Sequence, residues 1–125
     1  IKMLKKYVSG VTQDIELLIN DSTPTTIIYN NPQNIAENII AKDNTLAIRI
    51  PKHKFSNELI TEFGKPIVSS SANLSGNKTP VFFSEITSSI LEGVDHVVNL
   101  EKEKSGNKPS RIFKIDDGKI LTIRK

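Results

Sequence analysis

The chain has 125 residues, of which 37% are hydrophobic and 25% are charged, and its formal net charge is +3. This length suits one globular domain with its own core, and the composition is not that of a disordered chain. The sequence contains no cysteine, which excludes disulfides, thiolate nucleophiles and cysteine-ligated zinc. Apolar runs are short and the first residues lack the features of a signal peptide, so we expect a cytoplasmic protein without a membrane span.

Helical periodicity predicts four helices, each with a capping residue at its start. The caps are Thr12, Asn31 (followed by Pro32), Ser56 and Ser84. The inward apolar residues are Ile15, Leu18 and Ile19; Ile35, Ile39 and Ile40; Leu59, Ile60 and Phe63; and Ile86, Ile90 and Leu91. Gly64 and Gly93 are expected to end the third and fourth helices, because glycine is common just past a helix.

Segments rich in isoleucine, valine and threonine predict six strands. They cover residues 25–29, 45–50, 66–70, 96–100, 111–115 and 120–124. The sequence Asp116-Asp117-Gly118 is typical of a tight turn, which makes the last two strands a hairpin. The alternation of helices and strands predicts one α/β domain over residues 1–125, with a twisted mixed sheet, helices packed around it and a terminal β-hairpin.

The strand predicted at 45–50 carries two polar residues of interest. Alternate side chains share a face, so Thr45 and Arg49 lie on the same side of the sheet. Arg49 lies two residues before Pro51, at the end of the predicted strand, where its planar guanidinium suits a carboxylate or a phosphate. The pattern alone fits a solvent-facing arginine equally well.

Residues 66–76 run from an apolar pair into Ser69, Ser70 and Ser71, and then into Ala72-Asn73-Leu74-Ser75-Gly76. Hydroxyls and small residues after a strand suit the close approach of an anionic ligand, although a polar turn has the same composition. A covalent serine mechanism is not expected, because the G-x-S-x-G elbow of serine hydrolases is missing. The two histidines, His53 and His96, lack the spacing of metal ligands.

These segments resemble the YrdC/TsaC family of threonylcarbamoyl-AMP synthases. The family carries an R-[IV]-P strand end, an S-[TS]-S-A-N-x-S-G loop, a P-S-T strand and a final arginine, in that order. The corresponding positions here are Arg49-Ile50-Pro51, Ser69 to Gly76, Pro109-Ser110 and Arg124. Thr23-Pro24-Thr25-Thr26 is similar to the family's P-G-P-x-T segment, so the resemblance extends over about the whole chain.

The resemblance implies a nucleotidyltransferase that joins L-threonine, bicarbonate (or CO2) and ATP into threonylcarbamoyl-AMP and pyrophosphate, for modification of tRNA with partner proteins. It assigns ATP binding to Thr45, Ser71, Asn73, Thr79 and Arg124, and threonine binding to Arg49, Ser69 and Ser110. Mg2+ is expected with the ATP, without a protein side chain identifiable as its ligand. The slightly basic chain is compatible with tRNA, although its lysines are spread out rather than clustered.

The sequence departs from the family pattern in three respects. Ser70 and Arg111 stand where threonine is common, and the early lysine-x-arginine motif is not in this chain. The amino-terminal part of the catalytic domain is therefore expected to be missing, and we expect the chain alone to be inactive. Two other functions stay open: a carbamoyl-adenylate domain of a hydrogenase-maturation protein, and a non-catalytic RNA-binding module.

Overall fold

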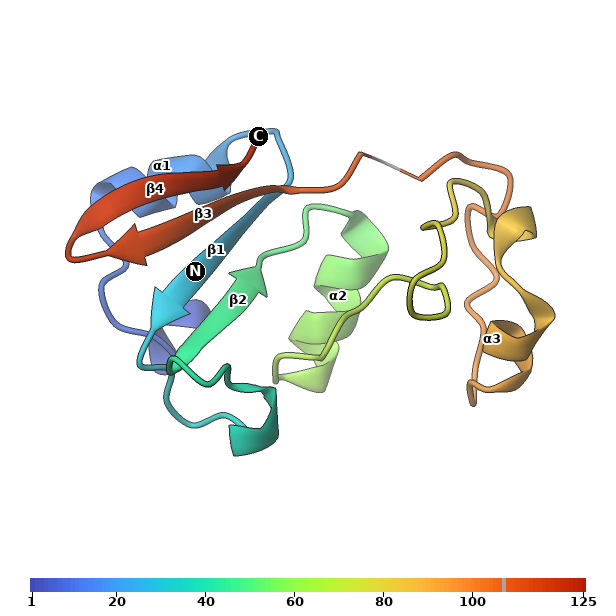
Figure 1. Cartoon of the computed structure of the whole chain (residues 1–125), viewed down its shortest axis with the longest axis horizontal. Coiled ribbons are helices and arrows are strands. Elements are labelled where there is room, and N and C mark those ends of the chain that lie inside the picture. Colours follow the sequence, from blue (N-terminus) through green and yellow to red (C-terminus); the bar gives the residue numbers. More distant parts are fainter. Residues whose placement is uncertain (107) are drawn as a thin grey trace. The chain divides into compact units, whose positions relative to one another are not determined.

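A computed structural model describes residues 1–106 and 108–125, which divide into two compact units (Figure 1). The first, here called the sheet unit, combines Ile1–Pro66 with Pro109–Lys125. The second, here called the loop unit, is Ile67–Lys108.

The sheet unit is built on a four-stranded mixed sheet in the order β2-β1-β3-β4. Its strands are β1 (Thr25–Asn30), β2 (Thr45–Arg49), β3 (Arg111–Asp116) and β4 (Lys119–Arg124). The central strand β1 pairs antiparallel with β2 and parallel with β3, while β3 and β4 form an antiparallel hairpin. Asp117 and Gly118 both have positive φ, at 47° and 75°, as expected for a two-residue hairpin turn. The predicted mixed sheet and terminal hairpin are confirmed.

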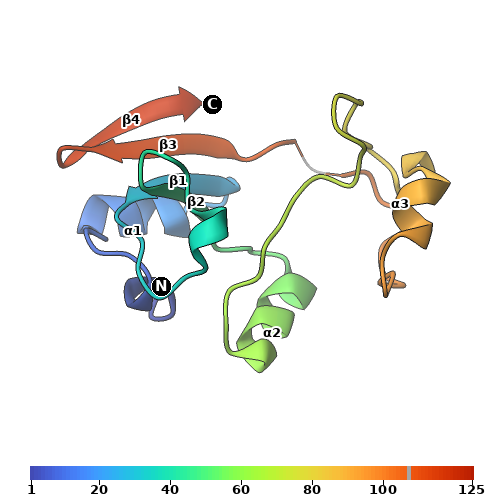
Figure 2. The same cartoon turned by 60° about the horizontal axis from the view of Figure 1, so that its bottom comes forward.

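The core of the sheet unit lies between the sheet and the first helix. Helix α1 (Gln13–Asn20) begins after Thr12 and lies along one side of the sheet (Figure 2). Its residues Ile15 and Ile19 pack with Ile27 and Tyr29 of β1. The cluster is completed by Leu4 and Val8, from and just after the short 3₁₀ helix η1 (Leu4–Lys6). The first predicted helix and its buried stripe are confirmed, because apolar residues at i and i+4 meet alternate residues of the strand.

The third predicted helix is present as α2 (Lys54–Phe63), which begins two residues before Ser56. Gly64 ends it in the left-handed conformation, with φ 72°, and its N–H donates to the carbonyls of Ile60 and Thr61. The prediction that its apolar face points inward is wrong for the described chain, since Leu59 is 46% and Phe63 is 60% exposed. Periodicity gives a helix its apolar stripe, but burial also needs an element that covers it.

The helix predicted after Asn31 is wrong. Asn31 and Asn34 take positive φ values of 50° and 55°, and the segment contains only the 3₁₀ helix η2 (Glu37–Ile39). The amide N–H of Gln33 donates to the Tyr7 carbonyl at 2.7 Å, and the Asn34 side chain donates to the Lys6 carbonyl at 3.1 Å. These hydrogen bonds hold a turn against the amino-terminal segment, and asparagine tolerates the left-handed conformation that the turn requires.

The loop unit has less regular structure than predicted. It contains the 3₁₀ helix η3 (Phe83–Glu85) and helix α3 (Ser88–Glu92), so the fourth predicted helix begins after Thr87 rather than at Ser84. The strands predicted at 66–70 and 96–100 are wrong, because the described part of both segments forms no strand. A strand is stabilised by the partner to which it hydrogen-bonds, and β propensity alone does not supply one.

Candidate functional site

Four strand ends meet at one end of the sheet and carry three of the predicted site residues. Arg49 ends β2 and pairs with Thr26 near the start of β1. Ser110 directly precedes β3, which is parallel to β1, and Arg124 ends β4 opposite Ile112. Neighbouring strands lie about 4.8 Å apart, so the four strand ends span about 14 Å. The structure therefore brings Arg49, Ser110 and Arg124 to the same end of the sheet.

Contacts from two strands hold Ser110 in place at this end of the sheet. It is only 8% exposed, and its hydroxyl lies 2.7 Å from the Thr26 hydroxyl. The guanidinium of Arg124 donates from Nε and Nη2 to the Ser110 carbonyl, at 3.0 and 2.7 Å. The Ser110 side chain and main chain are thus held from two different strands. Arg49 is exposed, which leaves a cationic group beside the hydroxyls.

This end of the sheet presents its polar groups on the side opposite α1. Ile27 and Tyr29 are buried against α1, and side chains alternate along a strand, so Thr26 points to the other side. Arg49 shares that side, because directly paired residues of antiparallel strands face the same way. Two arginines and two hydroxyls on one side can bind an anionic group such as a carboxylate or a phosphate.

Thr45 lies at the other end of β2 and is buried, with 7% of its surface exposed. Its hydroxyl donates to Asp43 Oδ1 at 2.6 Å, and Lys114 Nζ lies 3.7 Å from Asp43 Oδ2. The hydrogen bond from Thr45, followed in weight by the charge of Lys114, holds the pKa of Asp43 below its usual value. Thr45 and Arg49 belong to one strand, as predicted, but the Thr45 hydroxyl is used within the protein.

The other predicted site residues, Ser69, Ser71, Asn73 and Thr79, all belong to the loop unit. The two serines and Thr79 are exposed, on a segment without regular structure. Asn73 shapes this loop, because its side-chain amide donates to the carbonyls of Leu74 and Asn77, at 3.0 and 3.1 Å. Its Oδ1 is buried and has no hydrogen-bond partner among residues 1–106 and 108–125. The assignment of Ser69 to threonine binding, and of Ser71, Asn73 and Thr79 to ATP binding, stays a prediction.

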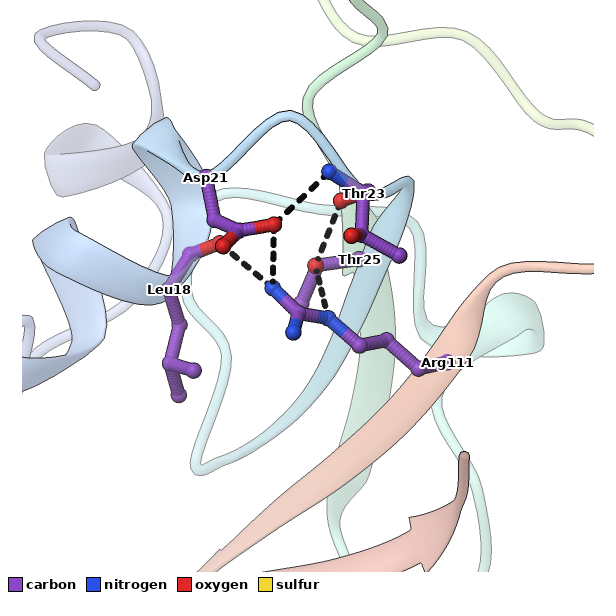
Figure 3. Close-up of polar contacts among 5 residues, drawn as sticks. All are labelled: Leu18, Asp21, Thr23, Thr25 and Arg111. Carbon is purple, nitrogen blue, oxygen red and sulfur yellow. Dashed lines mark hydrogen bonds and ion pairs between the residues drawn. The ribbon is translucent and has the colours of Figure 1, made fainter.

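Arg111 joins three segments of the sheet unit and was not among the predicted site residues (Figure 3). Its guanidinium donates from Nε to the Thr25 hydroxyl at 2.8 Å, and its Nη2 lies 3.0 Å from Asp21 Oδ1 and 3.5 Å from the Leu18 carbonyl. It therefore ties β3 and β1 to the carboxyl end of α1, where a cation is favoured.

Asp21 is the acidic partner of Arg111 in this cluster of contacts. Hydrogen bonds from Thr23, its backbone N–H first, hold the pKa of the Asp21 carboxyl below its usual value, with a smaller contribution from the Arg111 charge. Arg111 follows Ser110 in the chain and points toward α1, away from the polar side of the sheet end. Arg111, which stands where the resembling family commonly has threonine, thus makes its contacts on the α1 side of the sheet. The only signal in the sequence was this departure from the family pattern.

Two classes of site are not found in the described part of the chain. Residues 1–106 and 108–125 contain no group of three or more histidine, aspartate or glutamate side chains that could hold a metal ion. None of the helices described there is long and apolar enough to cross a membrane.

Comparisons with known proteins agree with this architecture. The profile of the Sua5/YciO/YrdC family, described as "Telomere recombination", matches residues 1–125. The fold is similar to that of the crystal structure of E. coli YciO, with a TM-score of 0.78 over 99% of this chain and 61% of that chain, at 22% sequence identity. The chain therefore belongs to the Sua5/YciO/YrdC family.

The curated relatives of this chain include proteins named threonylcarbamoyl-AMP synthase. A protein of Methanocaldococcus jannaschii, provisionally named threonylcarbamoyl-AMP synthase, is 41% identical over 101 residues, which are 81% of this chain and 46% of the relative. The threonylcarbamoyl-AMP synthase of Pseudoalteromonas translucida is 33% identical over 122 residues, which are 94% of this chain and 65% of the relative. The chain thus spans about half to two thirds of the length of these relatives.

Proposed function

We propose that this chain is part of an L-threonylcarbamoyladenylate synthase, a nucleotidyltransferase that forms threonylcarbamoyl-AMP and pyrophosphate from L-threonine, bicarbonate or CO2, and ATP. The observation that carries the proposal is the sheet end, where Arg49, Ser110 and Arg124 meet on one side. Relatives named threonylcarbamoyl-AMP synthase over most of this chain support it. The product would serve threonylcarbamoyladenosine modification of tRNA, with tRNA and transferase proteins as partners, in the cytoplasm.

Threonine would bind through its charged main-chain groups. The exposed Arg49 guanidinium would pair with the carboxylate, for which its planar fork is suited. The Ser110 hydroxyl, already held in place, would orient the amino acid so that its nitrogen reaches the carbon dioxide. Ser69, which belongs to the loop unit, is also assigned to threonine binding by the resemblance.

ATP would be held by Thr45, Ser71, Asn73, Thr79 and Arg124. The chemistry of Asn73 sharpens its role, because its two amide hydrogens are used within the loop and only the acceptor Oδ1 remains. Because this oxygen is buried, Asn73 would support ATP binding by holding the conformation of the loop. Arg124 would stabilise phosphate charge, and its hold on the Ser110 carbonyl would link the two subsites.

The reaction requires positioning and charge stabilisation rather than a protein nucleophile. Carbamate attack on the α-phosphate displaces pyrophosphate, and cationic groups stabilise the charge that develops on the phosphate oxygens. Mg2+, expected with the ATP, would be held mainly by ATP phosphates and water. In this role Mg2+ would neutralise phosphate charge.

The natural gene product carrying these 125 residues provides the test. Pyrophosphate release should require L-threonine, bicarbonate and ATP together. Arg49→Ala should raise the KM for L-threonine about 10- to 100-fold, since a hydrogen bond to a charged group contributes about 1.5–3 kcal/mol. Lys54→Ala, which removes an exposed cation paired with Glu58 at 3.8 Å, is the matched control and should change the KM less than twofold.

Calorimetry with ATP and with L-threonine distinguishes the other two functions. Ser71→Ala should weaken binding of ATP and leave an intact fold. Pyrophosphate release that depends on carbamoyl phosphate instead of threonine would identify the hydrogenase-maturation activity. Salt-sensitive RNA binding without binding of ATP or threonine would identify an RNA-binding module and overturn the proposal.

A further inference from the structure

Thr26 occupies the position between the two residues proposed to bind threonine. It pairs with Arg49 of β2 on one side, and its hydroxyl lies 2.7 Å from the Ser110 hydroxyl on the other. It is half-buried, on the side of the sheet that faces away from α1. Its hydroxyl lies on the polar side of the sheet end, but the proposed binding of threonine and ATP assigns no role to Thr26.

The backbone of Thr26 is held firmly. Its neighbours are Thr25, 6% exposed and bonded to Arg111, and Ile27, 1% exposed in the core. Threonine is branched at Cβ and has few χ1 conformations on a strand, so the hydroxyl has a nearly fixed direction. By contrast, Ser110 lies just outside β3 and its small side chain has three staggered rotamers. The contact with Thr26 therefore selects one of these rotamers.

We propose that Thr26 is a positioning residue that fixes the Ser110 hydroxyl for L-threonine. This inference rests on the proposed function. The Ser110 carbonyl is already anchored by Arg124, at 3.0 and 2.7 Å, so the main chain is fixed and only the side-chain rotation is left to Thr26. When the Thr26 hydroxyl forms one hydrogen bond with Ser110, the remaining donor or lone pairs of Ser110 are directed toward the ligand.

The test compares two substitutions at Thr26 in the natural gene product. Thr26→Val keeps the branched shape and removes the hydroxyl, and should raise the KM and the calorimetric Kd for L-threonine roughly 3- to 10-fold, the effect of one neutral hydrogen bond. The KM for ATP should stay within about twofold of wild type. Thr26→Ser keeps the hydroxyl and should restore the threonine KM to within about twofold of the wild-type value. Thr122→Val, at an exposed threonine of β4, is the matched control and should behave as wild type.

A double-mutant cycle separates positioning from a contact of Thr26 with the ligand itself. If Thr26 acts through Ser110, Thr26→Val should add nothing to the threonine KM of Ser110→Ala. Additive effects of the two substitutions would overturn the inference. It is also overturned if Thr26→Val leaves the threonine KM unchanged, or if both Thr26 variants raise the KM for ATP and threonine alike.

The failure of this inference differs from the failure of the proposed function. An active wild-type protein whose threonine KM responds to Ser110→Ala but not to Thr26→Val would refute the role of Thr26 alone. A wild-type protein that neither binds L-threonine nor releases pyrophosphate in its presence would refute both.

Discussion

The sheet unit and the loop unit differ in how their residues are buried. Every side chain that is buried in the described chain belongs to the sheet unit, where six apolar residues form one core. In the loop unit, large apolar residues are exposed, including Val68 at 76%, Val94 at 49% and Leu100 at 48%. The proposed ligand residues are divided between these two environments.

The difference separates two kinds of binding residue. Arg49, Ser110 and Arg124 lie at the ends of hydrogen-bonded strands that a core supports, so their backbone is set before a ligand arrives. Ser69 and Ser71 lie on an exposed segment without a strand or helix to hold it. Ordering such a segment costs conformational entropy on binding, so the two groups should contribute differently to affinity.

The largest expected effect tests whether the two units differ in core packing. Ile27→Ala in β1 removes a side chain that is 1% exposed and should lower the free energy of unfolding by about 2–5 kcal/mol. Val68→Ala in the loop unit should change it by less than about 0.5 kcal/mol. Urea denaturation followed by circular dichroism measures both. A Val68→Ala variant as destabilised as Ile27→Ala would show that the loop unit has a buried core in solution.

A smaller effect is expected from the ion pairs of the two units. Arg111→Ala removes the contacts with Asp21, Thr25 and the Leu18 carbonyl, and should cost about 1–2 kcal/mol, since the pair is partly exposed. In the loop unit, Lys104 forms an exposed pair with Glu101 at 2.8 Å, and Lys104→Ala should cost less than about 0.5 kcal/mol.

Arg111→Lys sharpens the same comparison. Lysine keeps the charge near Asp21 but lacks the planar fork by which Nε bonds Thr25 while Nη2 reaches Asp21 and Leu18, so most of the loss should remain. Full recovery of stability in Arg111→Lys would show that charge alone accounts for the contact.

The sequence predicted the fold best where local pattern and burial agree. The four strands of the sheet, the terminal hairpin and α1 agree with the prediction. The apolar residues that carry the pattern in β1 and α1 are the ones that pack in the core. The strands at 66–70 and 96–100 have the same composition but no strand partner in the described chain. The segment after Asn31 has the sequence of a helix start but forms a turn, since Asn-Pro is common in both.

The candidate site was predictable only in part. The resemblance selected Arg49, Ser110 and Arg124, and the strand register brings them to one end of the sheet. Thr26 and Arg111 could not be selected for their roles from pattern alone. Their hydrogen bonds join residues 84 and 86 positions apart in the chain, and such contacts follow from the parallel pairing of β1 with β3.

The smallest expected effect concerns Asp43, an exposed carboxylate of the sheet unit that accepts a hydrogen bond from Thr45. Thr45→Val removes the hydroxyl that donates to Asp43 at 2.6 Å, so the pKa of Asp43 should rise toward its ordinary value.

The lowered pKa of Asp43 makes the stability of the fold depend on pH. Because the folded-state pKa is lowered, this hydrogen bond stabilises the fold above the unfolded-state pKa of about 3.9, and the stabilisation is lost as the pH falls through the folded-state value. The variant should therefore lose less stability than wild type between about pH 5 and about pH 2, a window that brackets the unfolded-state pKa of about 3.9. Carboxyl NMR titration of Asp43 measures the change, with Thr45→Ser as the control that keeps the hydroxyl and the low pKa. An unchanged Asp43 pKa in Thr45→Val would assign the lowering to Lys114 instead, 3.7 Å away on β3.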